Sequence, residues 1–194
     1  MKIIDVPQYG PMFRFGDTNV YWALHLLSCG KRMGRKALAN LVGVGEGSMR
    51  RILDTLKEWE MISVKQTGIS LTRTGSGFLN ELPMKVLNLN IGDLVLGKHQ
   101  QAVKVLGVAS KIENGMQQRD AGIRAGASGC TTIIFRNGNL MMPPDWDLDK
   151  ERPALAEEIR KNIDLGPDDV IIIGGADDPH SAVNAALAAA FELF

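Results

Sequence analysis

Apolar residues recur at steps of three and four through the first part of the chain, which is the spacing of amphipathic helices. This pattern predicts helices over residues 19–28, 35–41 and 46–60. Two short runs of β-branched residues, 62–65 and 69–72, predict strands joined by a tight turn, and a closing helix follows them. Three helices, a hairpin and a last helix form a winged helix-turn-helix, so we expect that fold here.

The helical pattern stops at Pro83, which cannot continue a helix. We therefore expect two domains, a head of residues 1–82 and a body of residues 83–194. The body is predicted to be an α/β sandwich, so the whole chain falls in the α+β class. Its predicted strands or extended segments are 86–96, 101–108, 130–135, 139–142 and 170–173, and its predicted helices are 115–127, 150–163 and 179–193. The β-α-β-β-α-β order after residue 100 predicts a split βαβ unit of the ferredoxin-like kind.

The predicted helix 46–60 has one apolar side and one polar side, as a helix does when it enters the major groove of DNA. Arg51 is expected to make a bidentate contact with guanine, and Ser48 and Arg50 to contact phosphates or flanking base edges. Thr55 is expected on the same outer side as Ser48 and Arg51. Asp54 and Glu58 share this side, and they either pair with the arginines or accept a hydrogen bond from cytosine.

A ring of cations surrounds this predicted helix. Its members are Lys31, Arg32, Arg35 and Lys36 before the second helix, and Lys65 and Arg73 on the wing. The head holds 11 lysines and arginines against 7 acidic residues, whereas the body holds 11 against 15. A basic head on an acidic body favours a polyanion as the partner of the head, so we expect double-stranded DNA. Docking on a protein is the alternative, since winged helices also serve as protein-binding modules.

Two segments of the body carry candidate chemistry. Arg119 and Asp120 lie on a predicted helix that leads into a turn of small residues with Ser128, Thr131 and Thr132. These residues form a candidate site for a small-molecule effector, with Arg119 as the partner of an anion. The alternative is a tight turn with an internal Arg–Asp pair.

The second segment runs from Gly174 to Asp178 before the last predicted helix. Its two aspartates repel phosphate, so we expect them to cap the helix. A metal site with His180 is the weaker alternative, because three ligands so close in sequence rarely suffice. The last helix itself is rich in alanine, which permits close packing on the sheet or on a second copy. Since palindromic operators are usually met by two-fold dimers, we expect a homodimer.

Composition and missing motifs argue against several classes, with an enzyme kept as the less favoured alternative. No apolar run reaches the roughly 20 residues of a membrane span, and the first residues lack a signal-peptide core, so we expect a cytoplasmic protein. The two cysteines, Cys29 and Cys130, lie too far apart in sequence to form a metal or redox motif. Because no nucleophile elbow, phosphate loop or nucleotide fingerprint is present, we expect no enzyme, catalytic residue, metal or cofactor.

The run GRKALANLVGVGEGSMRRILDTLKEWEMI, with the wing and LTRTG after it, resembles the head of archaeal winged-helix transcriptional regulators of uncharacterised function. It is also similar to the N-terminal DNA-binding domain of the bacterial central glycolytic genes regulator. The resemblance to that bacterial domain covers residues 17–82 and implies that Glu46 to Trp59 is the recognition helix. The archaeal resemblance extends over the body, through QRDAGIRAGASGCTTIIF and GGADDPHSAVNAALAAAF. The sugar-phosphate domain of the bacterial family is much larger than this body, so no effector sugar is implied.

Overall fold

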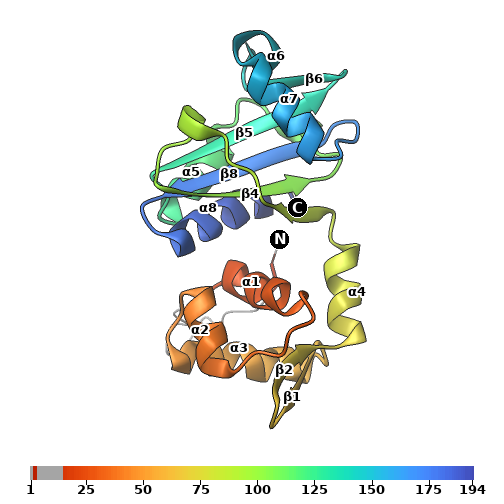
Figure 1. Cartoon of the computed structure of the whole chain (residues 1–194), viewed down its shortest axis with the longest axis vertical. Helices are drawn as coiled ribbons and strands as arrows, with labels where there is room; N and C mark the ends of the chain where they lie inside the picture. Colours follow the sequence, from red (N-terminus) through yellow and green to blue (C-terminus); the bar gives the residue numbers. More distant parts are fainter. Residues whose placement is uncertain (1, 4–14) are drawn as a thin grey trace. The chain divides into compact units, whose positions relative to one another are not determined.

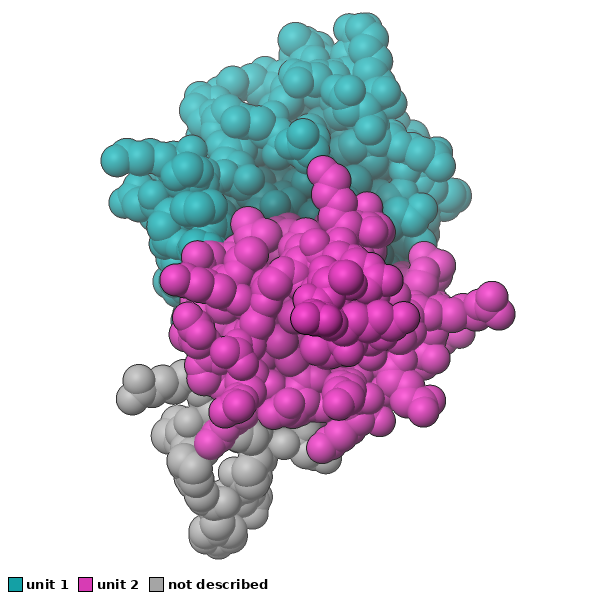
Figure 2. Space-filling model, turned by 60° about the horizontal axis from the view of Figure 1, so that its bottom comes forward, with its two compact units in different colours: residues 1, 83–194 teal, residues 2–82 magenta. Residues whose placement is uncertain are grey.

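The computed structural model describes residues 2, 3 and 15–194, which divide into two compact units, Lys2–Leu82 and Pro83–Phe194 (Figures 1 and 2). In the first unit the elements are α1 (Asp17–Leu27), α2 (Arg35–Val42), α3 (Glu46–Glu58), β1 (Ile62–Lys65), β2 (Gly68–Leu71) and α4 (Arg73–Glu81). Each predicted element of the head is present with shifts of only a few residues at its ends. The winged helix-turn-helix prediction is confirmed.

The turn between α2 and α3 depends on a glycine in the left-handed conformation. Gly43 has φ +75° and ends α2, and its N–H donates to the carbonyl of Ala39. A side chain is rarely tolerated at this φ, so glycine allows the chain to turn within three residues and begin α3. The two helices are then held together by fully buried apolar side chains such as Leu38, Ile52 and Leu56.

The wing is a small antiparallel sheet that is tied to the segment before α2. Its strands β1 and β2 pair from Ile62 opposite Leu71 to Lys65 opposite Gly68. Met33 adds an isolated bridge to Ile69 on the other edge of β2. Both edges of β2 are therefore paired, which fixes the wing to the helix-turn-helix.

The second unit is built on one six-stranded sheet with helices on both faces (Figure 1). Its strands are β3 (Met84–Leu87), β4 (His99–Val105), β5 (Gly129–Arg136), β6 (Asn139–Met142), β7 (Trp146–Asp147) and β8 (Val170–Ala176). Its helices are the short η1 (Gly92–Leu94) and η2 (Ala109–Lys111), and α5 (Met116–Arg124), α6 (Leu148–Glu151), α7 (Pro153–Asn162) and α8 (Pro179–Phe191). Helices α5 and α8 cover one face and α6 and α7 the other, so the sandwich architecture is confirmed.

The strand order is β3-β4-β8-β5-β6-β7, with every neighbouring pair antiparallel. Strands β4 and β5 both run antiparallel to β8, so they are parallel to each other and α5 connects them. This split βαβ unit was expected, but the ferredoxin-like order is wrong, because that order places the hairpin strand β6 in the gap that β8 fills. All seven residues of β8 are buried, and only a central strand has both faces covered.

Strand β8 also extends further than the sequence indicates, because Gly174 and Gly175 belong to it and not to a loop. A Cβ on Gly174 would lie 2.5 Å from the carbonyl oxygen of Ala182 in α8. A Cβ on Gly175, on the opposite face, would collide with the carbonyl of Leu96. The two glycines thus let backbone approach the sheet closely from both sides.

Two other boundaries differ from the prediction, and one predicted helix cap is present. The segment predicted as extended over 86–96 is strand only to Leu87. The helix predicted over 150–163 is broken at Arg152, before Pro153. The capping role expected of the aspartates before the last helix is confirmed for Asp178, whose carboxylate accepts a hydrogen bond of 3.0 Å from the backbone N–H of Ser181.

A buried ion pair lies at the end of the sheet where β4 ends and β8 begins. The Nζ of Lys104 in β4 lies 3.0 Å from the Asp169 carboxylate, and both side chains are almost fully buried. That carboxylate also accepts hydrogen bonds from the backbone N–H groups of Gly107 and Gly166. Lys104 in turn donates to the carbonyl of Asp164. Each charge therefore has the additional partners that burial demands.

Among the described residues, none of the helices combines the length and the apolar character that crossing a membrane requires.

Candidate nucleic-acid interface

Helix α3 has a buried and an exposed side, as its sequence pattern predicts. Met49, Ile52 and Leu56 have no exposed surface. Arg50 and Arg51 are both exposed. The apolar side anchors the helix in the core of the head and leaves the arginines facing solvent, which is the arrangement that a major-groove helix needs.

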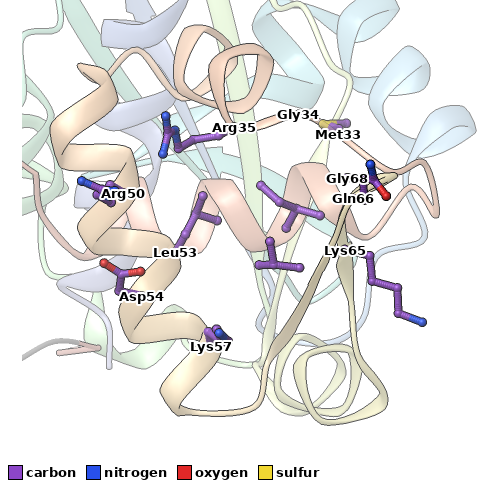
Figure 3. A pocket seen from close by; sticks show the side chains of 12 residues that line it. Met33, Gly34, Arg35, Arg50, Leu53, Asp54, Lys57, Lys65, Gln66 and Gly68 are labelled. Carbon is purple, nitrogen blue, oxygen red and sulfur yellow. The ribbon is translucent and has the colours of Figure 1, made fainter.

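A cavity of about 370 Å³ lies between α3, the wing and the start of α2 (Figure 3). Arg50, Asp54 and Lys57 line it from α3. Val64, Lys65 and Gln66 line it from the wing, and the Lys65 side chain extends away from the helix. The positive charges thus come from both α3 and the wing. The Asp54 carboxylate lies between Arg50 and Lys57 along α3.

The exposed residues of α3 divide into two rows. Successive residues of a helix are about 100° apart, so Arg50, Asp54 and Lys57 turn toward the wing while Arg51 lies on the outward side. Ser48 and Thr55 are half-buried on the flank away from the wing. Ideal helix geometry places both within about 60° of Arg51, on the outer side where the sequence analysis expects them, but they are less exposed than Arg51.

Two of the cations predicted to contact phosphate have partners within the head. The Arg32 guanidinium donates a hydrogen bond of 2.6 Å to the hydroxyl of Thr67 at the wing turn. Arg35 lies 3.7 Å from the carboxylate of Glu46, at the start of α3. Since both arginines are exposed, these contacts orient the guanidinium groups without covering them.

The other predicted cations are also exposed, at positions around the cavity and beyond it. Lys31 precedes the bridge at Met33, Lys36 is the second residue of α2, and Arg73 begins α4. Among the predicted cations only Arg35, Arg50 and Lys65 line the cavity itself.

Two further cavity residues, Lys57 and Gln66, were missed by the sequence analysis. Lys57 follows Arg50 at a spacing of seven residues, which places both on one row of the helix. That spacing could have identified Lys57. Gln66 lies in the wing turn and carries no comparable signal.

The structure also gathers the candidate residues of the body. Arg119, Asp120, Ser128 and Thr131 line one cavity of about 490 Å³. Thr132 lines a neighbouring cavity of about 190 Å³, to which Arg119 also contributes. The internal pair considered as the alternative is present as well, with Arg119 3.2 Å from the Asp120 carboxylate. The hydroxyl of Thr131 donates to the carbonyl of Leu94 and is thereby engaged.

Cys130 lies between these two cavities and borders both. Burial raises the pKa of its thiol to about 12, so the thiol stays protonated at neutral pH. A protonated, desolvated thiol is a poor nucleophile and acts here as a small apolar wall.

Residues 95–193 match the model of a family described as "Domain of unknown function (DUF4443)". The chain belongs to this DUF4443 family. Residues 18–86 of the DUF4443 protein match a second model, the CggR N-terminal DNA binding domain, which confirms the resemblance of the head. No match was found among curated proteins.

A hypothetical protein from Pyrococcus horikoshii OT3 is similar to the DUF4443 protein over both of its domains. The alignment covers 93% of each chain with a TM-score of 0.71 and a sequence identity of 23%. The two proteins therefore share the fold of the whole chain.

Proposed function

We propose that this DUF4443 protein is a transcriptional regulator whose head binds double-stranded DNA, with α3 in the major groove and the wing beside it. The observation that carries the proposal is the cavity between α3 and the wing, which is lined by cations from both walls. The match of the head to a DNA-binding domain family supports it independently.

In this arrangement the two rows of α3 have different roles. Arg51 faces outward, where a bidentate contact with guanine O6 and N7 discriminates between bases by about 1–3 kcal/mol. Arg50, Lys57 and Lys65 surround the cavity and bind phosphates on either side of the groove. Asp54 repels phosphate, so its position suits a contact with the amino group of cytosine.

The body is proposed to join two chains or to sense a small molecule. Of the two packing partners considered for the alanine-rich helix, the sheet is the one observed, because Ala182, Ala185 and Ala186 in α8 are buried within their own unit. The proposed homodimer therefore rests on the symmetry of operators alone. We place the regulator in the cytoplasm and assign it no enzymatic activity.

The proposal is tested by selecting binding sites for the full chain from a pool of randomised duplexes. We expect enrichment of one sequence that contains guanine. Arg51→Ala should then bind selected and random duplexes with nearly equal affinity, because it loses the base contact. Lys65→Ala should weaken both by a similar factor, because phosphates carry no sequence information.

Lys161→Ala is the matched control, since Lys161 is an exposed cation on α7 of the body. Its affinity should equal that of the wild type. A failure to enrich any sequence, together with unchanged affinity in Arg51→Ala and Lys65→Ala, would contradict DNA reading and favour docking on a protein.

A further inference from the structure

The two cavities of the body lie along one free edge of the sheet. Strand β6 pairs with β5 only at Ile134, Phe135 and Arg136. From Gly129 to Ile133, β5 pairs with β8 on one side and with no strand of the described residues on the other. Both cavities lie at this unpaired stretch, since Cys130 borders both and Thr132 one of them.

The backbone of β5 directs hydrogen-bonding groups toward this edge. The N–H of Phe135 donates to the carbonyl of Asp169, on the side of β8. Because N–H and C=O groups alternate between the two edges of a strand, those of Thr132 and Cys130 point to the unpaired edge. The edge thus offers donors and acceptors side by side, in the spacing of an extended backbone.

The wall opposite this edge carries one charge of each sign. Arg119 and Asp120 are adjacent on α5, about half exposed and 3.2 Å apart, and both line the larger cavity. A simple anion is not favoured there, because the Asp120 carboxylate offsets the Arg119 guanidinium. A molecule with a carboxylate and an ammonium group on neighbouring atoms can satisfy both.

Beside the hydroxyl groups of Ser128 and Thr131, the lining contains several exposed apolar side chains. Leu96 and Ile123 border the larger cavity with 69% and 46% of their surface exposed, and Met116 borders the smaller one with 50% exposed. Exposed apolar side chains gathered at one place mark a binding surface more often than isolated ones do. The larger cavity, about 490 Å³, lies within the usual range for small-molecule sites.

We propose that this edge of the body binds a free amino acid with an apolar side chain. The carboxylate of the ligand contacts Arg119, its ammonium contacts Asp120, and its side chain packs between Leu96 and Ile123. The N–H and C=O groups of Cys130 and Thr132 supply further hydrogen bonds. The ligand would serve as the effector of the regulator proposed above, but the site itself depends only on the body.

The test is calorimetric titration of the full chain with L-leucine and two isosteres. The first, 4-methyl-2-oxopentanoate, lacks the ammonium, and the second, 3-methylbutylamine, lacks the carboxylate. We expect saturable binding of leucine and affinities at least about tenfold weaker for both isosteres. Leucine, isoleucine, valine, methionine and phenylalanine are compared to define the side-chain preference.

Variants test whether binding takes place at this edge. Arg119→Gln and Asp120→Asn should each weaken binding at least about tenfold, with unchanged thermal stability because both side chains are exposed. Arg124→Gln is the control, since Arg124 lies on the same helix, pairs with Glu192 and borders neither cavity. Its affinity should not change.

Three results would overturn the site: no saturable binding of any of the five amino acids, isosteres that bind as tightly as leucine, or full affinity in both cavity variants. The titration contains no DNA, so its outcome is independent of the proposed DNA binding. If the chain binds leucine but no duplex, the amino-acid site stands and the proposed DNA binding fails. If it binds duplex but no amino acid, the DNA binding stands and the amino-acid site fails.

Discussion

Met33 and Ile69 exchange both of their backbone hydrogen bonds, with N to O distances of 3.0 and 2.8 Å. This bridge joins the segment before α2 to the inner strand of the wing. It therefore fixes the separation between α3 and the wing, which are the two walls of the proposed DNA site. Gly68, the first residue of β2 and next to Ile69, makes the approach possible, because a Cβ there would lie 3.2 Å from the carbonyl oxygen of Met33.

Gly68→Ala should destabilise the head by about 1–3 kcal/mol, because Gly68 has φ +119° as well as the close contact with Met33. Gly47→Ala is the control. Gly47 lies inside α3 with open space around it, so alanine should stabilise the helix by about 0.5–1 kcal/mol. Urea unfolding of both variants measures the difference. Equal stability of the two variants would show that the bridge does not constrain the wing.

Lys57→Ala should lower affinity for all duplexes by a similar factor and reduce the dependence on salt by about one counterion. The reason is its position in the row that faces the cavity, on the same side as Arg50. Fluorescence anisotropy across a range of salt concentrations measures both quantities. If the affinity and the salt slope of Lys57→Ala match those of Lys161→Ala, Lys57 does not contact the backbone.

Asp54→Asn should raise affinity for random duplexes and change the preferred base at one position of the selected site. The carboxylate repels phosphate and accepts from cytosine, whereas the amide does not repel phosphate and pairs best with adenine. Repeating the selection with this variant identifies the position. An unchanged site with unchanged affinity would exclude Asp54 from the interface.

Lys104→Met should destabilise the body by about 3–5 kcal/mol, because it leaves the buried Asp169 carboxylate without its counter-ion. Lys85→Met is the control, since Lys85 lies opposite Lys104 on the neighbouring strand but is exposed. That change should stay within about 0.5 kcal/mol. Denaturant unfolding monitored by circular dichroism compares the two. Similar small losses in both variants would mean that the pair contributes little.

Hydrogen bonds from Arg160 hold the pKa of Asp149 below its ordinary value. A carboxylate with a lowered pKa in the folded state stabilises the fold above its unfolded pKa, and this contribution is lost as the pH falls through the folded value. Asp149→Asn should therefore cost about 1 kcal/mol near neutral pH, allowing for partial exposure of Arg160, and almost nothing well below pH ~4. Thermal unfolding across this range checks the trend, which a pH-independent difference would contradict.

The head could be predicted closely from the sequence because its signals are local. The apolar stripe of α3, the glycine turn at Gly43 and the short β-branched runs each lie within a few residues of the structure they specify. The two rows of α3 were harder to assign, since the direction of the wing depends on the bridge between Met33 and Ile69.

The body was predicted less well because its organisation depends on contacts between distant segments. Gly174 and Gly175 have the composition of a loop, and only the approach of α8 and Leu96 explains their place in a strand. Lys104 gives no sign in the sequence that Asp169 is its partner. The uninterrupted apolar run of β8 did carry a signal for a central strand, and this signal argued against the ferredoxin-like order.

The salt dependence of duplex binding by the full chain tests the central claim most directly. If two heads together make about 6–10 phosphate contacts, affinity should fall by roughly 10³–10⁵ between about 50 and 200 mM salt. A linear decrease of this size in a plot of log affinity against log salt is the result we predict. Affinity that stays constant across this range, or the absence of any duplex binding at the lowest salt concentration, would contradict DNA binding by the head.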